Sequence, residues 1–431
     1  AAAERHERYV RLIVPGETEA VEEINPFARI YYVPAKYSPV FDKRYRIMMP
    51  WQYMQGGSII RKILLEEMPD MIEVTDKYTL SMIGVMVRIN KFRQIGRPML
   101  VHFSCERMDD NIGSFLSGGN IGKWFARRVI GNYTIPSFDY HIANSTYTAE
   151  EFFDSVSPDI NLKRSNSFLN WCWRAIKAPR VPVDERIFVC PRGVDSVLFT
   201  PDRISDNVRR EMLARTGIPE DAIILLYAGR ISPEKNIGLL ADLMKVLAND
   251  KDQDYRLIVA GAGPQGEWLK EETDKFSPGK VFQLGHLDKE TLANYYANAD
   301  VFVHPNPKEP FGIAPLEAMA SGVPTVAPNA GGILSYATNE NAWLVEPNGE
   351  AFANAIREVV TNDQLRESKV AKALETARSN TREASTDRLF ATYDKIYADF
   401  QNRRDLFTDR EKAKEFDFVT ELLTETPSSK S

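Results

Sequence analysis

The sequence contains few cysteines, and their positions exclude two classes of protein. Three cysteines occur in 431 residues, at Cys105, Cys172 and Cys190. Their spacing gives neither a disulfide framework nor a Cys-x-x-Cys metal pair. Reduced thiols in a cytoplasmic protein are the simplest interpretation.

Long apolar runs and an excess of positive charge are also absent. No stretch approaches the roughly 18–20 apolar residues of a membrane span, and no signal peptide is visible. The sequence therefore predicts a cytoplasmic protein, which would meet a membrane only through its surface. The net charge is −6, from 54 Lys+Arg against 60 Asp+Glu. Proteins that bind nucleic acids are more often basic, so we expect no nucleic-acid partner.

The length and the pattern of the chain predict two α/β domains. A chain of 431 residues is too long for one ordinary core. Apolar runs alternate with helix-like stretches in both halves, which is typical of parallel sheets covered by helices. We expect domains in residues 1–200 and 201–382, a helical segment in 383–415 and a polar tail in 416–431.

Two stretches of the first half depart from this rhythm. Residues 1–7 resemble the end of a helix, and a strand follows at once in 9–14. A parallel α/β domain usually opens with a strand, a glycine-containing loop and a helix, so the first strand and its loop are expected to be absent. Residues 155–184 are interpreted as an insertion with one amphipathic helix.

The clearest candidate site follows the strand at 301–304. The next residues contain three prolines and a glycine before a helix in whose first turn Pro315 fits. The backbone N–H groups of 312–314 then point out of the helix N-terminus, where they can bind phosphate oxygens. Glu309 lies on the loop and Glu317 in the first turn of the helix. One carboxylate can bind sugar hydroxyls and the other a ribose; the alternative for Glu317 is a carboxylate that complements the helix dipole.

A second candidate loop follows the strand at 223–227. It carries Arg230 and Lys235 before the next helix. Two cations beside a phosphate-binding helix end would neutralise a diphosphate and stabilise it as a leaving group. The alternative is a solvated loop with two ordinary charges.

Other chemistry-bearing residues give weaker signals. His102 ends a strand of the first half and is expected to reach the donor, with a packed core histidine as the alternative. Leu287 follows a strand of the second half, where its backbone can read a base or simply make a turn. Asp252-Gln253-Asp254 has the D-x-D form of metal-dependent transferases, but it precedes a strand. Ligands bind at the other end of such strands, so no metal site is expected.

A basic and aromatic stretch, residues 160–180, has three open interpretations. It could lie on an anionic membrane surface, cap an acceptor pocket, or pack its aromatic side chains inward.

These motifs resemble those of a known family. Glu309 and Glu317 form an E-x7-E pattern within 309–324, and Gly229-Arg230 and Lys235-Asn236 stand upstream. The chain thus resembles glycosyltransferase family 4, of the GT-B fold, over about residues 9–400. The resemblance implies an α/β protein with two Rossmann-like doubly wound parallel-sheet domains facing a cleft, and a final helix that crosses back to the first domain.

The resemblance also implies roles for individual residues. His102 and Glu309 would contact the transferred sugar, and Arg230 and Lys235 would hold the diphosphate. Leu287 would contact the base and Glu317 the ribose. The backbone of the helix entrance would complete the donor site at Phe311, Gly312, Ile313 and Ala314.

As a whole, the resemblance implies a retaining hexosyltransferase without a cofactor. Its donor substrate would be a nucleotide-diphosphate sugar of the GDP-mannose or UDP-glucose type, and the first half is more similar to GDP-mannose-dependent α-mannosyltransferases. The acceptor would be a hydroxyl of a glycan, a lipid or a small metabolite. Two alternatives stay open: a non-catalytic sugar-nucleotide-binding protein, and another GT-B enzyme such as an epimerase.

Overall fold

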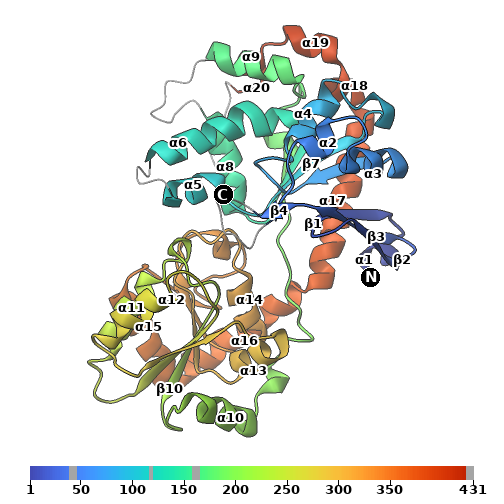
Figure 1. The fold of residues 1–431 in the computed structure, drawn as a ribbon. Coiled ribbons are helices and arrows are strands. Elements are labelled where there is room, and N and C mark those ends of the chain that lie inside the picture. Colours follow the sequence, from blue (N-terminus) through green and yellow to red (C-terminus); the bar gives the residue numbers. More distant parts are fainter. Residues whose placement is uncertain (38–45, 116–119, 158–165, 424–431) are drawn as a thin grey trace. The chain divides into compact units, whose positions relative to one another are not determined.

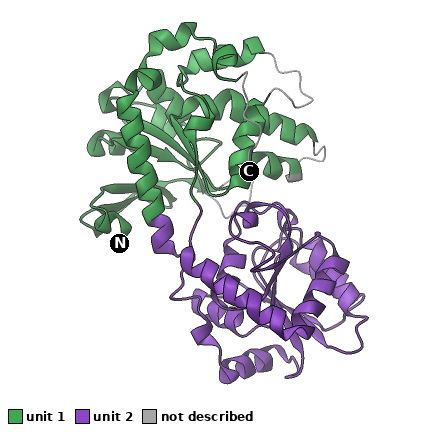
Figure 2. Ribbon diagram, turned by 180° about the vertical axis from the view of Figure 1, so that it is seen from behind, with its two compact units in different colours: residues 1–190, 387–431 green, residues 191–386 purple. Residues whose placement is uncertain are grey.

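The computed structural model describes residues 1–37, 46–115, 120–157 and 166–423 of the chain. Its contacts divide the chain into two compact units, coloured separately in Figure 2. Unit 1 comprises residues 1–190 and 387–431, and unit 2 comprises residues 191–386. The boundary near residue 190 lies ten residues before the one expected from the sequence, because Pro191 and Arg192 already group with the second unit.

Unit 2 is a doubly wound α/β domain. Its six strands form one parallel sheet in the order β12-β11-β10-β13-β14-β15. The strands are β10 Ile223–Ala228, β11 Tyr255–Ala260, β12 Val281–Gly285, β13 Val301–Val303, β14 Thr325–Pro328 and β15 Trp343–Val345. Strands such as β10, Ile-Ile-Leu-Leu-Tyr-Ala, are apolar throughout, as expected of strands covered on both faces.

Helices of unit 2 cover both faces of this sheet (Figure 1). One face packs against α11 Gly238–Leu247, α12 Gly266–Asp274 and α15 Gly349–Thr361. The other packs against α10 Asp206–Thr216, α13 Lys289–Ala297, α14 Ile313–Ala320 and α16 Asp363–Ser379. Short 3-10 turns lie at η4 Pro201–Arg203, η5 Pro233–Lys235 and η6 Gly332–Ser335.

Unit 1 contains the predicted parallel sheet, and it also has two smaller sheets that the sequence analysis missed. The parallel sheet has the order β6-β7-β8-β9, a mixed sheet has the order β1-β3-β2, and β4 pairs with β5 in a two-stranded sheet. The predicted parallel sheet is confirmed, and the antiparallel pairing of β2 with β3 was not predicted. The strands are β1 Val10–Gly16, β2 Ala20–Asn25, β3 Ala28–Pro34, β4 Lys36–Tyr37, β5 Arg46–Ile47, β6 Met71–Val74, β7 Met99–Ser104, β8 Tyr140–Ala143 and β9 Ile187–Val189.

The helices of unit 1 come from both ends of the chain. From the first segment these are α1 Ala2–Arg5, α2 Trp51–Met54, α3 Ile59–Glu67, α4 Met82–Arg88, α5 Met108–Phe115, α6 Asn120–Val129, α7 Ile135–Ser137, α8 Thr146–Val156 and α9 Asn166–Ile176. Near the C-terminus these are α17 Arg382–Asn402, whose first five residues group with unit 2, α18 Arg404–Thr408, α19 Arg410–Glu415 and α20 Phe418–Leu422.

The C-terminal helices supply part of the core of unit 1. Ile396 and Phe400 of α17 pack with Met99 and Val101 of β7. The prediction that a polar tail starts at residue 416 was wrong, because Phe418 and Leu423 are buried in the same cluster as Trp173. Their apolar side chains hold residues 416–423 on the unit, and residues 424–431 lie outside the described residues.

Candidate functional site

The N-terminus of α14 is built as a phosphate-binding helix end. Gly312, its N-cap, has φ +83°, a left-handed conformation that favours glycine. The hydroxyl of Tyr336 donates a hydrogen bond to the Gly312 carbonyl. The N–H groups of Ile313 and Ala314 belong to the first turn, whose N–H groups have no partner within a helix. The structure therefore presents two backbone donors and the positive end of a helix dipole at this point.

Glu309 lies on the loop before α14 and is held by a cation from another loop. The Nζ atom of Lys235 lies 2.8 and 3.1 Å from the two carboxylate oxygens. Asn306 donates a further hydrogen bond from Nδ2 at 3.0 Å. Burial would raise the pKa of Glu309, but Lys235 and the neighbouring polar groups lower it below its ordinary value. Glu309 is thus an ionised and partly shielded acceptor, suited to sugar hydroxyls.

The loop that carries Glu309 rests on a glycine pair that the sequence analysis did not single out. The Gly332 N–H donates to the Glu309 carbonyl at 2.7 Å. A Cβ atom on Gly332 would lie 1.9 Å from the carbonyl oxygen of Pro310, and one on Gly331 would lie 2.7 Å from that of Pro307. No side chain fits at such distances. The dipeptide Gly331-Gly332 after a strand was the available signal, and its role depends on a contact with residues more than 20 positions earlier.

Glu317 is the fifth residue of α14, so the prediction that it lies in the first turn was wrong, and burial dominates its ionisation. Burial raises the pKa of Glu317 to about 7, although the hydroxyl of Tyr296 donates to it at 3.2 Å. The sequence alone did not identify Tyr296 as its partner. A carboxyl group that titrates near neutrality can accept hydrogen bonds from a ribose once it is ionised.

The loop with Arg230 and Lys235 is fixed against the loop that follows β13. Asn236, in a left-handed conformation with φ +54°, donates from Nδ2 to the Pro305 carbonyl at 2.8 Å. The Tyr227 hydroxyl donates to the Arg230 carbonyl at 2.7 Å. Lys235 therefore reaches Glu309, while the guanidinium of Arg230 lies 3.6 Å from Glu234.

The predicted donor residues follow the carboxyl ends of neighbouring strands. Leu287, which is half-buried, follows β12 at one edge of the sheet. Arg230 and Lys235 follow β10, and Glu309 follows β13. Three strand spacings separate β12 from β13, which corresponds to about 14 Å. The order along the sheet is therefore base, diphosphate and sugar, if each residue has its expected role.

His102 is enclosed in the interior of unit 1. It lies within β7, two residues before the end of the strand, and not at the end as predicted. Its side chain is fully buried, with Nδ1 3.4 Å from Nδ1 of His141 and with the rings of Phe138 and Phe152 beside it. Burial and nearby positive charge, including that of Lys77, hold the pKa of His102 well below its ordinary value. This position favours the alternative of a packed histidine over contact with the sugar.

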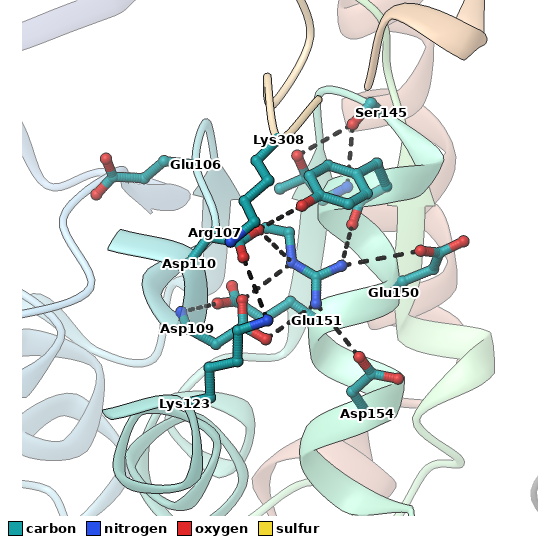
Figure 3. Close-up of polar contacts among 12 residues, drawn as sticks. Glu106, Arg107, Asp109, Asp110, Lys123, Ser145, Glu150, Glu151, Asp154 and Lys308 are labelled. Carbon is teal, nitrogen blue, oxygen red and sulfur yellow. Dashed lines mark hydrogen bonds and ion pairs between the residues drawn. The ribbon is translucent and has the colours of Figure 1, made fainter. Parts of the chain in front are cut away.

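A polar cluster lies beyond the carboxyl end of β7 (Figure 3). Arg107 binds Asp109 at 3.0 Å and Asp154 at 3.2 Å, and Glu151 accepts from the N–H of Asp109 at 2.8 Å. Lys77 binds Glu151 at 2.6 Å, with both side chains almost fully buried. These opposite charges satisfy one another, so the cluster fixes α5 and α8 against the sheet.

The last residue of the Asp252-Gln253-Asp254 motif is paired with two cations. The carboxylate of Asp254 binds Arg256 at 2.7 Å and Lys280 at 2.9 Å.

The basic and aromatic stretch at 160–180 is described only in part, because residues 160–165 lie outside the described residues. Of the aromatic side chains of α9, Trp173 packs in the core, whereas Phe168 and Trp171 are exposed, so the inward-packing interpretation holds only in part. None of the helices in the described part of the chain has the length and apolar character needed to cross a membrane.

Known proteins are similar to this chain over most of its length, and one family model matches its second half. Residues 208–376 match the family model of glycosyl transferases group 1. A GDP-mannose-dependent alpha-(1-6)-phosphatidylinositol dimannoside mannosyltransferase of Mycobacterium tuberculosis is 28% identical over 360 residues, covering 82% of this chain and 80% of the relative. A GDP-mannose-dependent alpha-mannosyltransferase of Corynebacterium glutamicum is 32% identical over 240 residues, covering 53% and 54%.

Solved structures confirm the fold class. Sucrose-phosphate synthase of Thermosynechococcus elongatus superposes with a TM-score of 0.66 at 19% identity, covering 92% of this chain and 91% of that one. Anabaena Alr3699/HepE in complex with UDP gives a TM-score of 0.60 at 19% identity, covering 78% and 81%. The chain has the α/β GT-B fold with two Rossmann-like units, as predicted from the sequence.

Proposed function

Because this chain is a glycosyltransferase with a glycosyl transferases group 1 domain, we propose that it transfers mannose from GDP-mannose with retention of configuration. The observation that carries this proposal is the order of residues along unit 2, with Leu287, the Arg230–Lys235 loop and Glu309 following strands of one parallel sheet, of which β12 and β13 lie about 14 Å apart. The mannosyl specificity is supported by the relatives of M. tuberculosis and C. glutamicum.

In the proposed reaction the bond from the anomeric carbon to the diphosphate breaks, and a bond to the acceptor oxygen forms on the same face of the sugar. The acceptor proton passes to an oxygen of the leaving diphosphate. Arg230, Lys235 and the N-terminus of α14 stabilise the charge that develops on that diphosphate. Glu309 orients the sugar through its hydroxyls, and Glu317 orients the nucleotide through its ribose.

Titration with GDP-mannose and UDP-glucose tests the donor site. We expect GDP-mannose to bind, and Arg230→Ala and Glu317→Ala each to weaken it by about 10- to 100-fold, since each removes a charged partner worth roughly 1.5–3 kcal/mol. Glu340→Gln, an exposed carboxylate of the same unit, is the matched control. Binding of UDP-glucose alone would transfer the proposal to that donor. Donor binding without transfer to any acceptor would favour a non-catalytic binding protein.

We further propose a lipid-linked acceptor, in line with the phosphatidylinositol dimannoside named for the M. tuberculosis relative. Unit 1 exposes apolar side chains on two helices. Phe168 and Trp171 of α9 are 48% and 64% exposed and stack on each other, and α6 exposes Ile121, Trp124 and Phe125. α6 also carries three basic residues and no acidic one. Helices of this kind are suited to anionic lipid surfaces.

Cosedimentation with phosphatidylinositol-containing vesicles tests the lipid surface. Substituting Phe168 and Trp171 with serine is expected to weaken binding at least tenfold, because each large apolar side chain that enters the lipid contributes roughly 1.5–3 kcal/mol. Trp268→Ser is the control, since Trp268 is an exposed aromatic residue of unit 2. Equal vesicle binding by the double variant and by Trp268→Ser would contradict a role of α9 in contacting lipid.

A further inference from the structure

His304 lies directly behind Glu309 and has an unused ring nitrogen. It follows the last residue of β13, and its side chain is only 6% exposed. Nε2 lies 3.9 Å from the nearer carboxylate oxygen of Glu309. This buried nitrogen makes no hydrogen bond within unit 2, all of which the structure describes. A polar atom left unpaired so deep in a protein is costly, which points to a state in which it has a partner.

The surroundings determine the form of the ring in the free protein. The Asn306 backbone raises the pKa of His304, as an acceptor for a ring proton does. Because Nε2 has no hydrogen-bond partner, we expect Nδ1 to carry the proton of the neutral ring. Burial, which outweighs the neighbouring carboxylate, lowers the pKa to about 4. The ring is therefore neutral near pH 7, with the lone pair of Nε2 toward Glu309.

In the free protein, Lys235 is the cation that neutralises the carboxylate of Glu309. Its positive charge also disfavours protonation of His304. Its ammonium group bridges both carboxylate oxygens of Glu309 and lowers the pKa of His304. Two further titratable groups face Glu309 from other elements: Tyr227 of β10 and Tyr336 beside η6. Both are neutral near pH 7, so neither can replace a lost cation.

We propose that His304 is a positioning residue that takes up a proton from solvent when the donor diphosphate draws Lys235 away from Glu309. The inference rests on the proposed function, in which Lys235 binds the diphosphate. An ionised Glu309 without its lysine would be a buried and unpaired charge. Protonation of Nε2 places an imidazolium beside the carboxylate, which stays ionised and can still accept hydrogen bonds from the sugar. The imidazolium of His304 thus holds Glu309 in place while Lys235 moves to the diphosphate.

Nitrogen NMR of ¹⁵N-histidine-labelled protein tests this directly, because the chain has only five histidines. His304→Asn identifies the His304 signals, and exposed His286 is an internal reference. In the free wild-type protein at pH 7 we expect a neutral ring protonated at Nδ1. With GDP-mannose at saturation, established by a separate binding isotherm, we expect an imidazolium. A ring that stays neutral at saturation overturns the inference and leaves the donor site standing, whereas the absence of any binding isotherm overturns both.

A second variant removes the dependence on donor binding. In Lys235→Ala, without nucleotide, we expect the titration midpoint of His304 to rise by at least one pH unit, because Glu309 then lacks its cation. Lys251→Ala, which removes an exposed lysine of the same unit, should leave the midpoint unchanged. An unchanged midpoint in Lys235→Ala in a folded protein would contradict the proposed exchange of partners.

Discussion

Replacement of Glu309 with glutamine is expected to lower kcat/KM for sugar transfer by about 100- to 1000-fold, the usual effect of losing one charged group that is aligned with the reacting centre. Glutamine keeps the size of the side chain and can still accept a hydrogen bond. It cannot pair with Lys235, whose ammonium lies 2.8 Å from the carboxylate. The measurement is the steady-state rate of transfer from GDP-mannose to a lipid-linked mannoside.

Two controls separate this effect from damage to the fold. Glu340→Gln makes the same chemical change on an exposed loop and should leave the rate unchanged. The thermal unfolding of Glu309→Gln should stay close to that of the wild type, because the loop is also held by the hydrogen bond between Gly332 and the Glu309 backbone. A rate within threefold of the wild type would contradict the assignment of Glu309 to the sugar.

Replacement of Asp139 with asparagine is expected to destabilise unit 1 by about 3–5 kcal/mol, the usual cost of breaking a buried ion pair from one side. The side chain of Asp139 is fully buried, and it binds Arg88 at 2.6 Å and Arg97 at 2.7 Å. It also accepts from the N–H of Leu100 at 2.8 Å. Without the carboxylate, two guanidinium groups lose their charge partner, and that of Arg88 is itself buried.

Calorimetry provides the measurement, since the two units can unfold in separate transitions. A nucleotide that binds unit 2 should raise the transition of that unit and so identify the other one. Asp184→Asn, an exposed aspartate of unit 1, should leave both midpoints in place. Equal midpoints for Asp139→Asn and the wild type would contradict the structural role of the pair.

The ion pairs of Asp139 also determine how the stability of unit 1 changes at acid pH. Burial would raise the pKa of Asp139, but Arg97 and Arg88 lower it below its ordinary value of about 3.8. A carboxyl group with a depressed pKa in the folded state binds protons more readily when unfolded. Its contribution is therefore complete above about pH 4 and is lost as the pH falls through the folded-state pKa.

The sequence alone determined the fold of unit 2 and the positions of its candidate residues. Its strands are continuous apolar runs, and the loops after them carry prolines, glycines and charges at fixed distances from the strand ends. Because the carboxyl ends of parallel strands meet at one edge, Arg230, Lys235 and Glu309 could be assigned to a common site. These features are local in the chain, so they can be recognised without knowledge of the packing.

Only the tertiary structure decided which partners those residues have. Two contacts join loops that are distant in the chain: the pairing of Lys235 with Glu309 and the support of the Glu309 backbone by Gly332. The burial of His304 beside the carboxylate likewise depends on the packing around the loop. The environment of His102 is likewise a product of packing, since a histidine near the end of a strand can face solvent or the core with the same local sequence. Burial and charge pairing depend on contacts across the fold, and these decide the ionisation of each group.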